Sequence, residues 1–503
     1  MIEMMFGKRE YEKIQLLNTL VANEDRAILI ADLMRELKWS KYLVLSIIEE
    51  VAIDLQDFYK DSPNILTLKS DKRIVMLDSA RQINVEALAA QYFHRTAGWQ
   101  MLIKMLNETM HSYTYFSERF NCSVGTARNT KVLLEKNLAE YSVVVSNDYQ
   151  LKSSSESRLR LMFLDLFRSY WCEDDTPFDA TTETMIDEAM IWLYKEVPVV
   201  GSLQMSAIQE IKIYLGILFV RIQKEHFASI EWVDKTLLDN ERLVGSSKAI
   251  VNRLIHQLIH QLAVSDEIAR VEARHFLVFL YALGIFSNTE ECLCLTDDLI
   301  QQQNRLIEMV LDEVQMLGDI KFSQLQNVRL GSYLEPKLIQ LSVKYGVESS
   351  EYGKATIAER FPDIDVIVGR IIAKFGTSIA MDVQTINNAL YTTLLMVICS
   401  VCQKERLYPK IRVELDLPGL PGTQQMISNM ILGMPEFNVD VTVQHDSDVD
   451  IVISSANRQD VARENLFEWR GLPTDKQVRQ LRARLRELRC KDVIKLINDV
   501  KTS

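Results

Sequence analysis

A polar and basic segment at residues 120–138 is the part of the chain best suited to bind a polyanion. It reads FNCSVGTARNTKVLLEKNL and contains no Asp or Glu over residues 122–134. On a helical wheel one quadrant collects four apolar side chains: Val124, Ala127, Leu134 and Leu138. Thr126, Arg128 and Asn129 point away from it, and such side chains bind phosphate oxygens and purine edges. The pattern indicates either a nucleic-acid-binding helix or a solvated helix end.

The first turn of this expected helix carries further signals. Ser123 is a natural N-cap, and the N-terminus of a helix attracts phosphate. Lys131 falls near the apolar quadrant, so its side chain would have to extend along that surface to reach a phosphate. The short helix and turn that precede this segment, with the hairpin that follows it, favour binding to DNA over a merely solvated helix.

An earlier helix offers a second candidate set at the corresponding place: Lys38, Ser40, Lys41 and Tyr42. The same helix carries the acidic residues Glu49, Glu50 and Asp54. Because carboxylates repel phosphate, we rank this set as an accessory contact, or as part of a packing or dimerisation unit.

The elements around these residues follow a repeated order. Three amphipathic helices, the second of them spanning RAILIADLMRELKW, and a polar hairpin fill residues 1–80. Helices and a second hairpin fill residues 81–155, so the sequence predicts two winged helix-turn-helix units in tandem. Helical periodicity then continues through two predicted all-α bundles, at residues 156–285 and 286–402. Three strands alternating with helices over residues 405–503 predict a small parallel α/β domain, in a protein that is mainly α.

Composition limits the classes of function. The length of 503 residues predicts three to five domains, and the net charge of -12 argues against general coating of nucleic acid or membrane. The longest apolar run is too short to span a bilayer. Seven scattered cysteines without a signal peptide predict a cytoplasmic protein. The chain has no phosphate-cradling Gly loop or Ser-His-Asp pattern, so we expect neither an enzyme nor a cofactor.

The whole chain resembles the Mga/AtxA family of Gram-positive transcriptional regulators. The stretch SVGTARNTKVLLEKNLAEYSVVVSNDYQLKSSSESRLRLMFLDLFRSYW follows that family's order of recognition helix, wing and first bundle, LGILFVRIQKEHF resembles the middle of a first sugar-system regulatory domain (PRD), and IRVELDLPGLPG with VDIVISS resembles a phosphotransferase IIB core. The resemblance implies two winged units, two PRD bundles and a IIB-like domain. It also implies gene activation tuned by histidine phosphorylation from the sugar phosphotransferase system.

The resemblance directs attention to the seven histidines, because such regulatory domains accept phosphoryl groups on exposed imidazoles. We expect His275 first, since adjacent Arg274 would stabilise a phosphate, and His226 second, at a helix end. The alternative is that both are ordinary surface or half-buried imidazoles. Residues 276–444 contain no His, so the second bundle is expected to serve dimerisation or signal relay. His256 and His260 have metal-ligand spacing, but with no third ligand evident we expect a packed or solvated pair and no metal.

The C-terminal segment departs from the IIB pattern. True IIB proteins carry a phosphorylated Cys after the first strand, whereas ELDLPGLPG has none. We therefore expect docking or oligomerisation there, and a homodimer overall. The expected partners are double-stranded DNA and the phosphocarrier protein of the sugar phosphotransferase system. Two alternatives stay open: an RNA-binding antiterminator with similar bundles, and a non-catalytic phosphotransferase scaffold.

Overall fold

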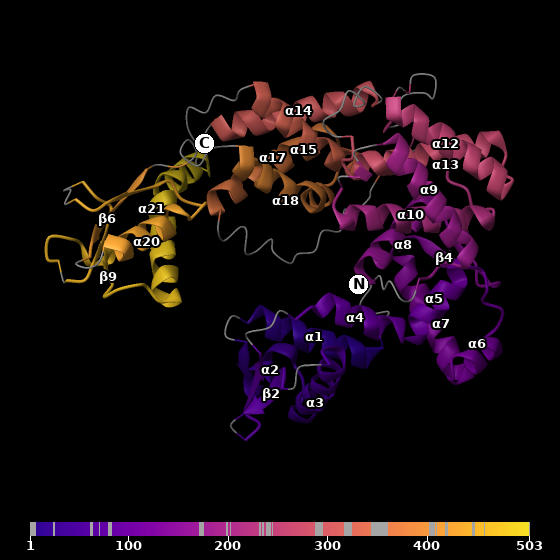
Figure 1. The fold of residues 1–503 in the computed structure, drawn as a ribbon, viewed down its shortest axis with the longest axis horizontal. Coiled ribbons are helices and arrows are strands. Elements are labelled where there is room, and N and C mark those ends of the chain that lie inside the picture. Colours follow the sequence, from indigo (N-terminus) through magenta and orange to yellow (C-terminus); the bar gives the residue numbers. More distant parts are fainter. Residues whose placement is uncertain are drawn as a thin grey trace. The chain divides into compact units, whose positions relative to one another are not determined.

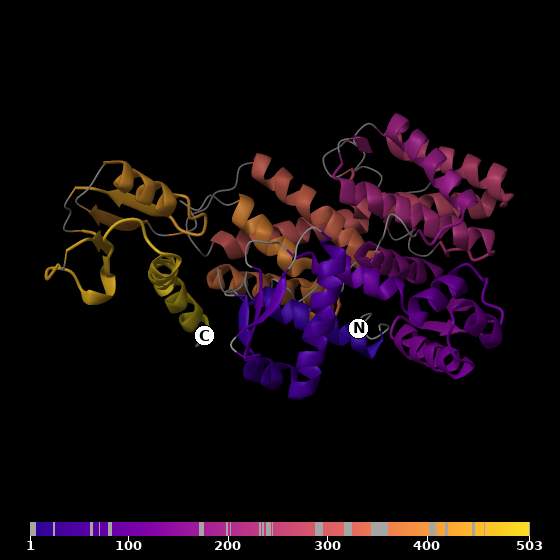
Figure 2. The same ribbon diagram turned by 60° about the horizontal axis from the view of Figure 1, so that its bottom comes forward.

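A computed structural model describes most of the chain and divides it into two compact units. Residues 1–231 with 245–277 form one unit, and residues 232–244 with 278–503 form the other. The described residues are 7–23, 26–60, 64–69, 71–78, 83–170, 176–197, 200–201, 203–230, 233, 236–237, 243, 245–286, 295–315, 324–343, 361–401, 408, 410–417, 421–444, 448–456 and 458–501. The protein is mainly helical, with a small parallel four-stranded sheet near its C-terminus (Figures 1 and 2).

The first part of the chain combines three helices with a three-stranded antiparallel sheet in the order β1-β3-β2. Its elements are α1 (Lys8–Ala22), β1 (Ala27–Leu29), α2 (Ile30–Leu37), α3 (Lys41–Phe58), β2 (Leu66–Lys69) and β3 (Ile74–Leu77). The predicted hairpin is present, but the predicted second helix starts later than expected. Ala27–Leu29 instead form a strand, because pairing with β3 gives their backbone groups hydrogen-bond partners that an extra helical turn would have to replace.

The next part repeats helices followed by an antiparallel strand pair. Its elements are α4 (Val85–His94), α5 (Ala97–Leu106), α6 (Tyr113–Arg119), α7 (Val124–Ala139), β4 (Val143–Val145) and β5 (Leu151–Ser153). Helix α7 packs against α5, α6 and β4. The strand pair β4–β5 lies where the sequence predicts the second hairpin.

Helices then follow one another without strands. The first set is α8 (Glu156–Tyr170), α9 (Ala180–Glu196), α10 (Met205–Gln223), α12 (Gly245–Leu262) and α13 (Asp266–Ala282). Helix α10 is its buried centre and packs on α8 and α9. Gly216 of α10 leaves room for the ring of Phe178, which precedes α9, since a Cβ there would lie 2.3 Å from that ring.

The second unit contains another helical set and the parallel sheet. The helices are α14 (Asp297–Gln315), α15 (Gln324–Val343), α17 (Pro362–Ser378) and α18 (Val383–Val401). The C-terminal elements are β6 (Ile411–Asp416), α20 (Pro421–Leu432), β7 (Val439–Thr442), β8 (Ile451–Ser454), the 3-10 helix η5 (Arg463–Asn465), β9 (Leu466–Glu468) and α21 (Asp475–Lys501). The sheet order is β7-β6-β8-β9, all parallel.

The sequence predicts only three of these four strands. It misses β9, which has three residues, none of them buried, and lies at the sheet edge, so it leaves no alternating apolar pattern. Buried side chains from β6, β8, α20 and α21 form the core of this domain. Across the described ranges, no helix combines the length and hydropathy that a membrane crossing requires.

Candidate nucleic-acid interface

Two helices joined by a tight turn contain the polar and basic segment at residues 120–138. Helix α6 ends with Asn121 in the left-handed conformation (φ 47°), and the amide of Cys122 donates to the carbonyl of Ser117 at 3.1 Å. Asn tolerates this conformation better than most residues, so the turn is locally encoded. Ser123 then caps α7, accepting a hydrogen bond from the amide of Thr126 at 2.9 Å.

Helix α7 buries one face and exposes the other, as predicted. Ala127, Leu134 and Leu138 are buried, whereas Thr126, Arg128 and Asn129 are exposed. Val124 is a correction, because it is 43% exposed rather than buried. A helical side chain lies over the turn that precedes it, and at the first position of α7 no such turn exists.

Lys131 lies near the buried face, where the sequence placed it, but its ammonium is already engaged. It forms an ion pair with Glu135 one turn later and lies 5.9 Å from the ring centre of Tyr149. Arg128, in contrast, is exposed, and its guanidinium carbon lies 6.0 Å from the ring centre of Tyr113. Of these two cations Arg128 is therefore the freer.

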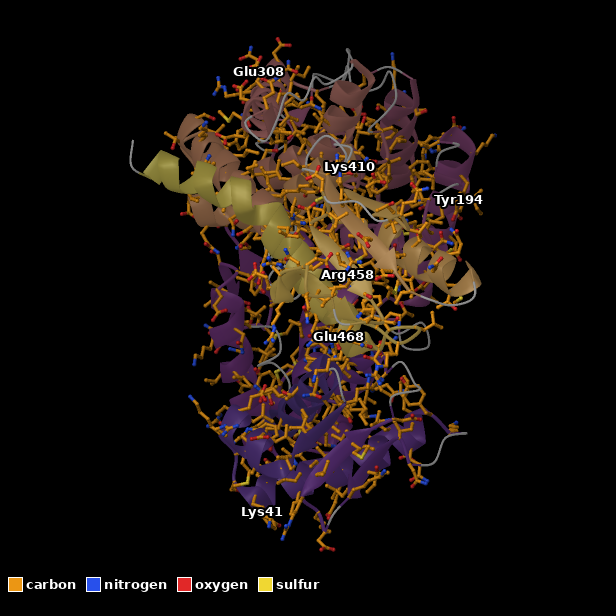
Figure 3. The ribbon with its side chains drawn as sticks, turned by 90° about the vertical axis from the view of Figure 1, so that its left-hand side faces the viewer. Lys41, Tyr194, Glu308, Lys410, Arg458 and Glu468 are labelled. Atoms are coloured by element: carbon orange, nitrogen blue, oxygen red, sulfur yellow. The ribbon has the colours of Figure 1, made fainter. Side chains whose placement is uncertain are left out.

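The earlier candidate set lies at the start of α3. Lys38 ends α2 in the left-handed conformation (φ 57°), and Ser40 caps α3 by accepting from the amide of Leu43 at 3.3 Å. Lys38, Ser40, Lys41 and Tyr42 are all exposed, and Figure 3 labels Lys41. The side chain of Tyr42 stands out, because the residue is 85% exposed.

Glu49, Glu50 and Asp54 of α3 are each paired with a cation, which the sequence did not reveal. The distances are 3.1 Å for Glu49 to Lys72, 3.1 Å for Glu50 to Arg9 and 2.9 Å for Asp54 to Lys13. The three carboxylates for which we ranked this helix as accessory therefore each have a positive partner. Each partner lies more than 20 residues away in the chain, so helical periodicity alone could not find these pairs.

Exposed cations on the first hairpin were also missed. Lys69, Lys72 and Arg73 are exposed around the turn between β2 and β3. The sequence shows these cations as KSDKR, a segment that by itself indicates only a polar turn. The first hairpin thus adds exposed basic side chains to those at the start of α3.

The structure separates the two predicted phosphate acceptors. His275 is only 3% exposed, and its Nε2 lies 2.5 Å from the carbonyl oxygen of Ser229. Burial lowers the pKa of His275, against an opposing effect of nearby Glu272. Arg274 beside it is also buried. An enclosed imidazole does not fit the exposed acceptor that the resemblance implies, so the order of the two candidates is reversed.

His226 is partly exposed and stands three residues beyond the end of α10. Its Nε2 lies 2.6 Å from Oε1 of Glu108. Glu108 follows α5, so this contact joins the first helical set to the part of the chain that carries α7. His256 and His260 are exposed with ring centres 4.1 Å apart. Within the described residues no group of three or more possible metal ligands occurs, and His445 lies outside those residues.

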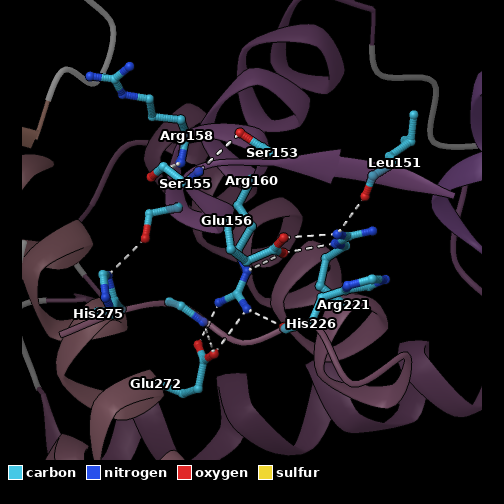
Figure 4. A network of polar contacts seen from close by, with 12 residues as sticks. Leu151, Ser153, Ser155, Glu156, Arg158, Arg160, Arg221, His226, Glu272 and His275 are labelled. Carbon is cyan, nitrogen blue, oxygen red and sulfur yellow. Dashed lines mark hydrogen bonds and ion pairs between the residues drawn. The ribbon is translucent and has the colours of Figure 1, made fainter. Parts of the chain in front are cut away.

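A buried charge network lies next to His226 (Figure 4). Arg160 contacts Glu156 at 3.1 Å and Glu272 at 2.5 Å, and donates to the carbonyl of His226 at 2.9 Å. Arg221 binds both carboxylate oxygens of Glu156 at 2.8 Å. Burial raises the pKa of Glu156, but Arg221 and Arg160 outweigh it and hold that pKa below its ordinary value. The positive charges of the two arginines and the negative charges of the two carboxylates thus cancel inside the protein.

An ionic cluster occupies the carboxyl ends of β6 and β8, where open parallel sheets usually bind ligands. Arg458 lies 3.0 Å from Glu414, 3.2 Å from Asp416 and 2.6 Å from Asp460. Ser454 donates a hydrogen bond to Asp416 at 3.0 Å. This carboxylate-rich arrangement is unsuited to binding phosphate.

Comparison with models of known protein families finds no match to the sequence, and comparison with curated proteins finds none either.

Proposed function

We propose that the protein is a DNA-binding transcriptional regulator of the Mga/AtxA type. The observation that carries the proposal is the start of α7: a capped helix that follows a short helix and a tight turn and exposes Thr126, Arg128 and Asn129 without a carboxylate in its first turns. Donors of this kind, on a helix preceded by such a turn, suit the major groove of DNA.

The other elements take their expected roles within this proposal. The helices α1–α3 with β1–β3, and α4–α7 with β4–β5, are two winged helix-turn-helix units, with α7 the main reader. The two helical sets are PRD-like bundles, and the C-terminal sheet is a IIB-like domain that lacks its phosphorylated Cys. The protein works in the cytoplasm as a homodimer, and the phosphocarrier protein modifies the first bundle.

Two alternatives use the same elements differently. An RNA-binding antiterminator would share the bundles, but the two tandem units of helices and strands at residues 7–153 favour double-stranded DNA. A non-catalytic phosphotransferase scaffold would use the ionic cluster around Arg458 for docking. That reading leaves the exposed face of α7 without a purpose.

The test is a triple substitution on α7: Thr126→Ala, Arg128→Ala and Asn129→Ala. Fluorescence anisotropy with a mixed-sequence DNA duplex measures affinity, and an RNA hairpin serves as the second probe. The Arg128 substitution alone should weaken DNA binding by about 1–3 kcal/mol if it contacts a base, and less if it contacts only phosphate.

A matched control removes the same side-chain types from exposed positions of α9 and α12: Thr184→Ala, Asn252→Ala and Arg253→Ala. This variant changes the net charge equally and should bind as the wild type does. Equal DNA binding by the α7 variant and the wild type would contradict the proposal. Loss of binding to RNA alone would support the antiterminator instead.

A further inference from the structure

Two helices end with the same local geometry, and their ends meet. After α5, Glu108 adopts a left-handed conformation (φ 54°) while the amide of Thr109 donates to the carbonyl of Lys104 at 2.8 Å. After α10, Glu225 also adopts the left-handed conformation (φ 60°), and the amide of His226 donates to the backbone carbonyl of Arg221 at 3.0 Å. Both are Schellman endings, in which a glycine normally takes the left-handed position.

The carboxylate of Glu108 uses this position to bridge two partners. Its Oε1 lies 2.6 Å from Nε2 of His226, and its Oε2 accepts a hydrogen bond from the side-chain amide of Gln150 at 3.1 Å. Gln150 immediately precedes β5, and its carbonyl accepts from the amide of Ser146 at 2.8 Å, which closes the loop between β4 and β5. The end of α10 is thereby connected to that loop.

A second connection runs in parallel. Arg221, in the last turn of α10, donates to the carbonyl of Leu151 at 3.2 Å. The backbone of His226 is itself held by Arg160, which binds Glu272 of α13. Two successive residues are therefore connected to the end of α10: Gln150 at the end of the loop through Glu108, and Leu151 at the start of β5 directly through Arg221.

The presence of Glu rather than Gly at position 108 indicates that the side chain has a role there. A side chain with a Cβ is strained in the left-handed conformation, and glycine would end α5 with less strain. The chain instead has a carboxylate there, and both of its oxygens are used. Glu225, in the same backbone conformation, is exposed and makes no comparable bridge among the described residues.

We propose that Glu108 is a positioning residue: by binding His226 after α10 and Gln150 before β5, it makes the position of the β4–β5 loop beside α7 depend on the position of the end of α10. If the protein binds nucleic acid as proposed above, its affinity should depend on this bridge, and that consequence rests on the proposed function. The bridge itself is a property of the fold and is testable without nucleic acid.

The test compares Glu108→Gly with Glu225→Gly in the full chain. Both substitutions relieve the same backbone strain, and only Glu108→Gly also removes the contacts with His226 and Gln150. Only Glu108→Gly should accelerate hydrogen–deuterium exchange of the β4–β5 loop amides, by about threefold to tenfold, the range expected for the loss of one or two hydrogen bonds. Gln150→Ala should reproduce this acceleration.

Rescue separates positioning from simple packing. His226→Gln keeps a donor for Glu108 and should exchange as the wild type does, whereas His226→Ala should resemble Glu108→Gly. The double variant Glu108→Gly/His226→Ala should be no faster than either single variant, because the two groups act in one chain of contacts. Unchanged exchange in Glu108→Gly, or additive effects in the double variant, would overturn the proposal.

DNA affinity measured on the same variants distinguishes the two proposals. Accelerated exchange with reduced affinity supports both. Accelerated exchange in a protein whose wild type binds no DNA keeps the bridge and rejects the proposed function. Unchanged exchange alongside normal DNA binding rejects the bridge and keeps the proposed function.

Discussion

The guanidinium group of Arg160 binds both carboxylate oxygens of Glu272, with Nη1 2.5 Å from Oε2 and Nη2 3.0 Å from Oε1. Both residues are completely buried, one in α8 and the other in α13. Planar pairing of this kind is the strongest geometry available to arginine and a carboxylate. The pair therefore fixes the relative placement of two helices that are far apart in the sequence.

Removing one charge of this pair should destabilise the protein strongly. Glu272→Gln leaves Arg160 buried with one negative partner, and breaking a buried pair typically costs about 3–5 kcal/mol. Urea unfolding followed by circular dichroism measures the loss. The control is Asp266→Asn, which removes the exposed partner of Arg270 on the same helix and should change stability little. Equal stability of the two variants would show that the buried pair contributes nothing specific.

The burial of His275 predicts a pH dependence of stability. Burial lowers its pKa in the folded protein, whereas the unfolded chain binds this proton at a pKa of about 6.5. Between those two pKa values the unfolded state holds more protons, so the free energy of unfolding should fall as the pH drops below about 6.5.

The measurement is denaturant unfolding at several pH values between about 5 and 7.5. His275→Gln should flatten the fall in that interval relative to the wild type. The exposed His111, substituted in the same way, should leave the slope unchanged. A wild-type slope retained in His275→Gln would show that another group causes the pH dependence.

Exposed residues at the start of α3 should contribute a second, smaller share of DNA binding. Lys41→Ala should weaken binding to all sequences and reduce the salt dependence by about one counterion. Tyr42→Ala should weaken binding without changing that slope. We expect both effects to be smaller than that of Arg128→Ala, because we propose that α7 is the main reader. A larger loss from Lys41→Ala would make the first unit the main reader.

If phosphoryl transfer controls the protein, it should label His226. Its imidazole is partly exposed, whereas that of His275 is enclosed. Incubation with the phosphorylated carrier protein, followed by mapping of acid-labile phosphate, should show label that His226→Ala abolishes and His275→Gln retains. Label that survives His226→Ala would identify a different acceptor. Complete absence of label would mean that the helical domains respond to another signal.

The sequence by itself determined the features that depend on neighbours along the chain. The caps at Ser40 and Ser123 join atoms three residues apart, and the face of α7 follows from a repeat of 3.6 residues. The two hairpins were likewise predicted, because alternation and polar turns are local signals. For the same reason the mainly helical class and the C-terminal parallel sheet could be anticipated.

Only the tertiary structure decided which charges are free. The sequence shows Glu49, Glu50 and Asp54 as a repulsive row, and only the fold supplies Lys72, Arg9 and Lys13 as their partners. It likewise offers His275 and His226 as similar candidates, although one is enclosed and the other faces Glu108. Burial and ion pairing depend on residues up to 118 positions apart. Such contacts arise when separate helices pack, and no local periodicity encodes them.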